Sequence, residues 1–297
     1  MKCRFTGQDI PIVHSFGMQP LANGFLPVDS KIDEYFFEMS VGVNLENGLF
    51  QLVNQPDPVQ MFHENYAFYS RTSNFMKAHF KEVASELRDI LRKDEISISD
   101  SFVIEVGSND GVMLEHMVNA GVRCLGIEPS LNVAKESNKF GVETISEFLG
   151  STLADQIVHS KGYANIVYAA NVFCHIPDIN DLAKSCSTLL KEDGYLVFED
   201  PYLGDVLQKT SYDQIYDEHV YLFNCTAVQD VFKKHGLVLF DCKHLNTHGG
   251  SMRYYFKKTS SVKHTDTLLK QLDLEEEIGI KDIKTYESFS EKCDFAK

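Results

Sequence analysis

The stretch FVIEVGSNDGVMLEHM, residues 102–117, decides the fold class. Its first five residues have the mostly apolar, β-branched character of a buried strand, and a helical pattern begins at Val112. Between the two lies a short turn with Gly107 and Gly111, which lets the backbone bend sharply and lets a ligand come close to it. A strand, a glycine turn and a helix in this order predict a ligand-binding loop of an α/β sheet.

The following segments alternate between strand and helix character, which predicts a parallel sheet with helices on both faces. The expected strands are 102–106, 123–128, 142–145, 165–170 and 194–200, and the expected helices are 112–119, 131–140, 151–159 and 178–190. Two further strand-like segments, 236–245 and 251–258, are joined by only a few residues. Because parallel neighbours need a crossover of a dozen or more residues, these two should form an antiparallel hairpin. The expected fold is therefore a Rossmann-like sheet of seven strands.

The rest of the chain divides into flanking units. Residues 1–65 hold short apolar runs separated by Gly, Pro and Asn, which predicts a small β-rich domain. The α/β domain is placed at 66–260, with an amphipathic helix over 74–93 near its start. Residues 261–297 are predicted to form a charged helical tail.

Composition excludes several classes of protein. Apolar residues make up 43% of the 297 residues, and no run approaches the roughly 18 apolar residues of a membrane span. Forty-three acidic residues against 28 basic ones give a net charge of −15, which argues against binding to nucleic acid or anionic lipid. The N-terminus is too polar for a secretory signal, and the seven cysteines are scattered through apolar segments. We therefore expect a cytoplasmic protein with reduced, buried thiols.

Acidic side chains surround the glycine turn. Glu105 ends the first strand, Asp110 lies in the turn, and Glu128, followed by Pro129, ends the second strand, where a carboxylate can bind two ribose hydroxyls. A dinucleotide site needs G-x-G-x-x-G and a phosphate loop needs Gly-Lys-Ser/Thr, whereas this turn reads G-x-x-x-G and its carboxylates would repel a pyrophosphate. A cationic nucleoside without phosphate suits these groups, which favours S-adenosylmethionine and disfavours a dehydrogenase.

The turn resembles motif one of class I S-adenosylmethionine-dependent methyltransferases, and the wider chain resembles the C-methyltransferases of nucleotide-linked 4-keto-deoxysugars. The similar segments are QPLANGFLP (19–27), GLFQLV (48–53), YAFYSRTS (66–73), EVGSNDG (105–111), GIEPS (126–130), ANVFCHIPD (170–178), QIYDEHVYLF (214–223) and HGGSMRYYF (248–256). The resemblance implies a cofactor site built from Glu105, Gly107, Ser108, Asn109, Asp110, Gly111, Glu128, Pro129, Phe148 and Asn171.

The catalytic candidates follow from the chemistry of this family. Methylation of carbon requires an enolate, so the site needs a base and donors for the enolate oxygen. Tyr216 and His219 are spaced to share one face of a helical turn, His175 follows the fourth strand, and Glu218 can orient an imidazole. We expect His219, or Tyr216 helped by His219, to remove the C3 proton of the sugar. His175 and Tyr216 would then hold the enolate.

An anionic nucleotide-sugar substrate needs local cations despite the net negative charge. The candidates near the expected mouth of the pocket are Arg71, Lys77 and Arg253, and Tyr66 and Tyr69 are candidates for contacts with the sugar. Each also has a structural explanation, as a solvated surface charge or as a packed aromatic ring.

The chain departs from the family at three places. The family's N-terminal domain usually binds zinc through two Cys-x-x-Cys pairs, but the matching positions here are Cys3, Thr6, Asn44 and Asn47. One thiolate cannot supply the four ligands of a structural zinc site, so we expect no metal. Asp217 stands where the family has the first histidine of a Tyr-His-Glu-His element. The family also usually continues with a further α/β domain beyond the helical tail.

Two other functions stay open at this point. An O- or N-methyltransferase acting on a related sugar or small molecule needs no enolate, so the cluster of Tyr216, His219 and His175 would have no role. A non-catalytic S-adenosylmethionine-binding protein agrees with the lost zinc ligands. It does not explain why the cofactor acids and the candidate base are both present.

Overall fold

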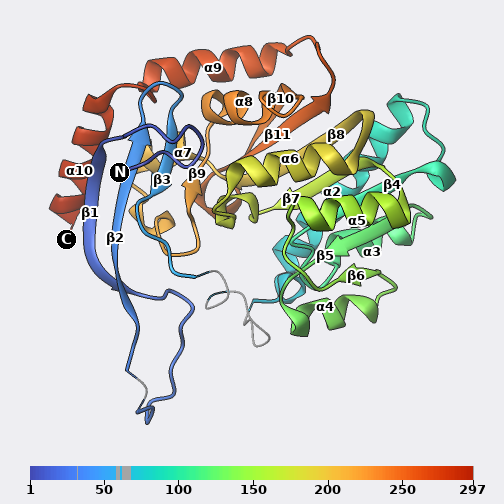
Figure 1. Ribbon diagram of the computed structural model, residues 1–297, viewed down its shortest axis with the longest axis horizontal. Helices are drawn as coiled ribbons and strands as arrows, with labels where there is room; N and C mark the ends of the chain where they lie inside the picture. Colours follow the sequence, from blue (N-terminus) through green and yellow to red (C-terminus); the bar gives the residue numbers. More distant parts are fainter. Residues whose placement is uncertain (32, 58–60, 62–67, 297) are drawn as a thin grey trace.

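The computed structural model describes residues 1–31, 33–57, 61 and 68–296. Its larger sheet has seven strands in the order β10-β11-β8-β7-β4-β5-β6 (Figure 1). The strand bounds are β4 Phe102–Val106, β5 Arg123–Ile127, β6 Thr144–Ile145, β7 Ala164–Ala170, β8 Leu190–Pro201, β10 Leu237–Leu245 and β11 Ser251–Lys258. Neighbours from β6 to β8 are parallel, whereas β11 is antiparallel to both β8 and β10. The predicted seven-stranded sheet with a terminal hairpin is confirmed.

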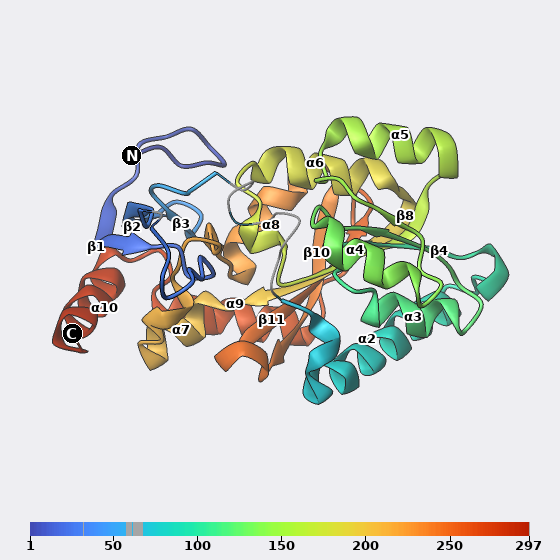
Figure 2. The ribbon, with the colours of Figure 1, turned by 90° about the horizontal axis from the view of Figure 1, so that it is seen from below.

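Helices cover both faces of this sheet (Figure 2). The helix bounds are α2 Asn74–Lys93, α3 Val112–Val118, α4 Leu131–Asn138, α5 Ser151–Lys161, α6 Ile179–Leu189 and α8 Cys225–Lys233. Successive strand residues point to opposite faces, so Val103 and Ile166 pack with α2 and α3, while Ile104 and Val167 pack with α5, α6 and α8. Both faces of the sheet are therefore buried, as parallel strands require.

A second sheet of four antiparallel strands, in the order β1-β2-β3-β9, lies beside the larger one (Figure 1). Its bounds are β1 Ile12–Pro20, β2 Phe36–Asn44, β3 Leu49–Leu52 and β9 Tyr221–Leu222. Its last strand comes from the segment after β8, so the small β-rich unit is completed from within the α/β unit predicted at 66–260.

The C-terminal segment is helical, as predicted, and folds back on the rest. It forms α9 (Asp266–Ile278) and α10 (Ile283–Ala296), and α7 (Leu203–Lys209) lies nearby. The apolar side chains of β2 and β3 form one buried cluster with those of α7 and α10, such as Leu207 and Phe289. Within the described ranges, no helix combines the length and the apolar character needed to cross a bilayer.

Candidate active site

A cavity of about 690 Å³ opens at the carboxyl ends of the parallel strands. Val106 of β4, Ile127 of β5, Ala170 of β7 and Pro201 of β8 all line it, so these strand ends converge on one volume. The volume is typical of sites for small molecules, and this edge is where α/β sheets bind ligands. One end of the cavity lies at the glycine turn, and the other lies at the segment before β9.

The glycine turn is shaped by backbone constraints. Gly107 has a φ of +66°, and a Cβ at this position would lie 2.2 Å from a methyl group of Val172, so only glycine fits. Asn109 holds the turn, because its Oδ1 accepts a hydrogen bond from the backbone N of Ser70 at 3.0 Å and its Nδ2 donates to the carbonyl of Phe68 at 3.1 Å. Both Gly107 and Asn109 line the cavity.

Glu128, just after β5, lines the same end of the cavity. Its Oε2 accepts a hydrogen bond from the backbone N of Asn109 at 3.0 Å, and its Oε1 accepts one from the backbone N of Ser130 at 2.8 Å. Each oxygen keeps a second acceptor position, so the carboxylate can also accept hydrogen bonds from ribose hydroxyls. The other predicted cofactor residues that line this end are Pro129, Phe148 and Asn171.

The remaining residues predicted for the cofactor do not line the cavity: Glu105 of β4, and Ser108, Asp110 and Gly111 of the turn. Burial, followed by repulsion from Asp110 and Glu128, raises the pKa of Glu105 well above its usual value. Asp110 accepts a hydrogen bond from the backbone N of Arg71 at 2.9 Å and is also buried. A nearby positive charge would lower the raised pKa values of Glu105 and Asp110 and stabilise the ionised carboxyls, so this group of buried acids favours a cationic ligand.

Tyr216 and His219 meet at the other end of the cavity. The hydroxyl of Tyr216 lies 3.1 Å from Nε2 of His219, and Nδ1 of the same ring lies 2.7 Å from the carbonyl oxygen of Gln214. A carbonyl oxygen can only accept, so the proton of the neutral ring is assigned to Nδ1, and Nε2 accepts from the tyrosine hydroxyl. Burial lowers the pKa of His219 to about 4, so the ring is neutral near pH 7.

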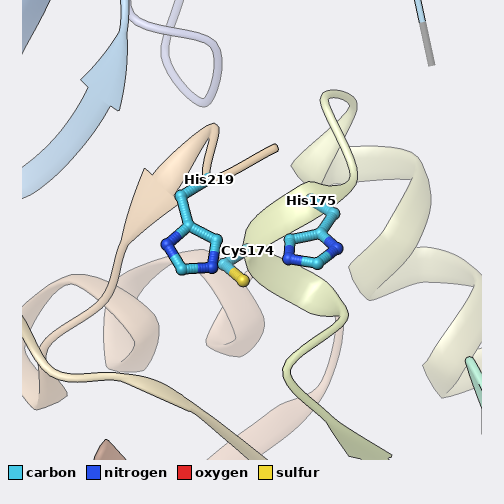
Figure 3. A group of neighbouring side chains, drawn as sticks. All are labelled: Cys174, His175 and His219. Atoms are coloured by element: carbon cyan, nitrogen blue, oxygen red, sulfur yellow. The ribbon is translucent and has the colours of Figure 1, made fainter. Parts of the chain in front are cut away.

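His175 reaches the same end from the short 3₁₀ turn Phe173–His175, which follows β7. Its ring centroid lies 5.3 Å from that of His219, and Figure 3 shows the two imidazoles on either side of the Cys174 thiol. Burial lowers the pKa of His175 well below its usual value, and the neighbouring His219 lowers it further. The fold thus brings His175 to the same end of the cavity as Tyr216 and His219, which belong to a later segment.

Cys174, His175 and His219 are the one group in the described part of the chain that could hold a metal ion, with ligand atoms within 4.8 Å of one another. The chemistry of the donors opposes this role. Burial, together with Asp200, raises the pKa of the Cys174 thiol well above its usual value, whereas metal binding needs the thiolate. Both ring nitrogens of His219 are also already engaged in hydrogen bonds. The absence of a metal stays a prediction.

Glu218 lines this end of the cavity, but its hydrogen-bond partner belongs to the small sheet. Its Oε1 accepts a hydrogen bond from Nδ2 of Asn23, in the loop between β1 and β2, at 2.6 Å. Among the described contacts Glu218 makes no hydrogen bond to His219, and the carbonyl of Gln214 orients that imidazole instead. Burial raises the pKa of Glu218 to about 7.

The prediction that Arg253 contacts a phosphate at the mouth of the pocket is wrong. Its side chain is buried and forms ion pairs of 2.6 Å with both Glu199 and Glu86. The register of the sheet explains this, because Arg253 of β11 lies opposite Glu199 of β8. The guanidinium therefore pairs with one buried and one half-buried carboxylate and is not available to a substrate.

The other predicted substrate residues also lie off the cavity wall. Arg71 pairs with Glu115 of α3 at 2.6 Å, and Lys77 is exposed on α2. The hydroxyl of Tyr69 accepts a hydrogen bond from Nδ2 of Asn132 at 2.9 Å. Tyr66 lies outside the described residues. Over the ranges that the structure describes, no lysine or arginine lines the cavity.

Among the residues that the sequence analysis does not assign to the site, Asn23, Gln214 and His248 line the cavity. His248 has a φ of 52°, precedes Gly249 and Gly250, and lies close enough to His219 to contribute to lowering the pKa of that ring. All three belong to segments that resemble the sugar C-methyltransferase family, namely 19–27, 214–223 and 248–256. That resemblance was the available signal.

The four positions that match the family's zinc ligands form hydrogen bonds or pack. Nδ2 of Asn44 lies 3.3 Å from Oγ1 of Thr6, and Oδ1 of Asn47 accepts a hydrogen bond from the backbone N of Leu49 at 3.0 Å. Cys3 is buried. A side-chain hydrogen bond thus links the two segments that zinc would link, and the absence of zinc stays a prediction.

A seven-stranded sheet of this order, with an acid-lined glycine turn after its first parallel strand, defines the class I methyltransferase fold. Residues 75–241, more than half of the chain, match the family model described as a methyltransferase domain. The chain therefore belongs to the S-adenosylmethionine-dependent methyltransferase family. Residues 246–297 match a second model, described as a C-methyltransferase C-terminal domain, which begins inside the unit predicted at 66–260.

The chain is also similar to individual proteins. The chain is 32% identical over 254 residues to the C-methyltransferase NovU of Streptomyces niveus, covering 84% of this chain and 59% of that protein. It is 23% identical over 154 residues to a ubiquinone biosynthesis O-methyltransferase of Yersinia enterocolitica, covering 46% of this chain and 64% of that protein. A solved structure of magnesium protoporphyrin IX methyltransferase (ChlM) from Synechocystis superposes with a TM-score of 0.49 and 13% identity over 63% of this chain and 88% of that one. The chain spans less than two thirds of both curated relatives.

Proposed function

We propose that the protein transfers a methyl group from S-adenosylmethionine to C3 of a nucleotide-linked 4-keto-deoxysugar through an enolate. The observation that carries this proposal is the Tyr216–His219 hydrogen bond beside His175, at the far end of a cavity that begins at an acid-lined turn. Methylation of oxygen or nitrogen needs no enolate, and therefore no hydrogen-bond donor for an enolate oxygen. The similarity to the C-methyltransferase NovU over 84% of this chain supports the same reaction class.

The cofactor end suits S-adenosylmethionine, which when bound supplies a methyl group on a positively charged sulfur. Gly107 lines this end of the cavity with backbone alone, because a residue with a Cβ there would collide with Val172. Glu128 is placed to bind ribose hydroxyls, and the buried carboxyls of Glu105 and Asp110 behind the wall favour a cation.

Tyr216 and His219 are arranged to move a proton away from the substrate. The C3–H bond breaks, the phenolic oxygen of Tyr216 takes that proton, and the former tyrosine proton passes to Nε2 of His219. The electron pair stays on the sugar as the enolate. On the opposite edge of the imidazole, Nδ1 of His219 donates a hydrogen bond to the carbonyl oxygen of Gln214 at 2.7 Å. This geometry supports Tyr216, helped by His219, as the base.

The enolate oxygen needs a donor, and His175 supplies it in this proposal. Its ring lies beside that of His219, so an acceptor in contact with the base also lies near His175. Because the described wall has no lysine or arginine, we place only the sugar ring inside the cavity and the diphosphate outside it.

Exchange of the C3 proton with solvent deuterium tests the proposal. With S-adenosylhomocysteine bound, no methyl is available, so NMR reports proton removal alone. We expect His219→Ala to slow exchange by about 100-fold or more, and the exposed His159→Ala to leave it unchanged. Full exchange in His219→Ala would end the assignment.

O-methylation is the second candidate, because ubiquinone biosynthesis O-methyltransferases match the chain. Their matches cover 32% to 46% of it, against 84% for the C-methyltransferase. An O-methyltransferase would act without any exchange at carbon, so the same experiment separates the two reactions.

A further inference from the structure

The loop between β1 and β2 reaches from the small sheet to the acceptor end of the cavity. Asn23 of this loop lines the cavity, and its Nδ2 lies 2.6 Å from Oε1 of Glu218, 195 residues further along the chain. Beside it, the backbone N of Ala22 donates a hydrogen bond to Oδ1 of Asp217 at 3.0 Å. Two neighbouring carboxylates of the catalytic segment therefore hold two consecutive residues of the loop.

Within the described ranges, Asn23 is the one side chain that forms a hydrogen bond with Glu218. Glu218 is 2% exposed, and the titratable groups that act on it or respond to it are Asp217 and the thiol of Cys174. Burial is the main cause that raises the pKa of Glu218, the hydrogen bond from Asn23 lowers it, and the charge of Asp217 raises it. A charge-assisted hydrogen bond also fixes the direction of a carboxylate. With Oε1 held, Oε2 remains for a substrate hydroxyl.

We propose that Asn23 is a positioning residue for Glu218, and that the small sheet thereby completes the methyl-acceptor end of the active site. The inference rests on the proposed function for the identity of the acceptor. It also gives a role to the aspartate at position 217, because that carboxylate anchors the same loop through Ala22.

Titration of the Glu218 carboxyl group tests the inference without any substrate. In protein labelled with ¹³C-glutamate, its NMR signal is identified by its loss in Glu218→Gln. Asn23→Ala should move the titration midpoint to higher pH by roughly one unit, and Asn23→Asp should move it further, because a donor is lost and a negative charge is added. Asp217→Asn keeps an acceptor oxygen for Ala22 but removes a charge, so it should lower the midpoint. Phe25→Ala, in the same loop and 77% exposed, is the control.

Kinetics then separate positioning from simple stabilisation. The acid limb of the kcat/KM profile should move in the same direction as the Glu218 midpoint in each variant. The affinity for S-adenosylhomocysteine should stay unchanged, because Asn23 lies at the acceptor end. A wild-type midpoint in both Asn23→Ala and Asp217→Asn would overturn the inference. A wild-type protein that methylates no keto-sugar would instead overturn the proposed function, and the NMR titration would still decide on Asn23.

Discussion

The hydroxyl of Tyr216 lies 3.1 Å from Nε2 of His219, and the opposite nitrogen of that ring lies 2.7 Å from the carbonyl oxygen of Gln214. The carbonyl keeps the proton on Nδ1, so Nε2 is the nitrogen that can receive one from the tyrosine. A hydroxyl and an imidazole held in this way act as one unit, in which the imidazole activates the oxygen.

Removing either Tyr216 or His219 should lower kcat about as much as removing both. We expect Tyr216→Phe and His219→Gln each to lower kcat by about 100-fold, and the double variant to lose little more, because proton transfer fails in all three. Steady-state kinetics with a keto-sugar nucleotide would measure this. Losses that multiply in the double variant would show two independent roles.

Glu128 should dominate recognition of the ribose. Hydrogen bonds to a charged group contribute about 1.5–3 kcal/mol, so Glu128→Ala should weaken S-adenosylhomocysteine binding by about 10- to 100-fold. Isothermal titration measures this loss. Glu143→Ala, which removes an exposed carboxylate away from the cavity, should bind as the wild type does. An unchanged affinity in Glu128→Ala would remove Glu128 from the ribose role.

The raised pKa of Glu218 should make the stability of the protein fall with rising pH. Burial raises this pKa from 4.5 to about 7, so between these values the folded carboxyl keeps a proton that the unfolded one releases. Glu218→Gln has no carboxyl group to ionise. Its free energy of unfolding should therefore exceed that of the wild type by about 3 kcal/mol at pH 8 and equal it near pH 4. Urea unfolding at both values is the measurement. A difference in stability between Glu218→Gln and the wild type that grows towards acid pH would contradict the raised pKa of Glu218.

Arg253 should matter for stability and not for substrate affinity. Arg253→Met removes the guanidinium that pairs with the buried Glu199 and the half-buried Glu86, so the free energy of unfolding should fall by about 3 kcal/mol. Lys77→Ala, at an exposed position of α2, should change it by less than about 0.5 kcal/mol. Denaturant unfolding compares the two. Equal stabilities would mean that the buried ion pairs do not form.

Elements with local signals were predictable, and elements held by distant contacts were not. The seven strands of the large sheet carry apolar runs bounded by glycine turns, and the predicted bounds of 102–106 and 251–258 agree with β4 and β11. The two-residue β9 has no pattern of its own, because it forms by pairing with β3 of the small sheet. Helix α8 is an exception, because the sequence analysis does not predict it although it has a local signal. Asn224 caps this helix by accepting a hydrogen bond from the backbone N of Ala227.

The residues of the candidate site also differ in how far the sequence predicts their positions. Glu128 and Asn171 follow strand ends, so their place at the cavity could be expected from the fold class. Asn23 could not, because its position depends on how the small sheet meets the large one. The pocket role predicted for Arg253 is wrong because this side chain pairs with Glu199. That pairing depends on the register of β8 and β11, which the sequence does not specify.

The position of the transferred methyl group tests the central claim most directly. The protein would be incubated with S-adenosylmethionine that carries a ¹³C-methyl group and with a nucleotide-linked 4-keto-deoxysugar, and the product analysed by NMR. We predict that the labelled carbon is bonded to C3 of the sugar. A label found on oxygen or nitrogen, or no transfer by a protein that binds the cofactor, would contradict the account.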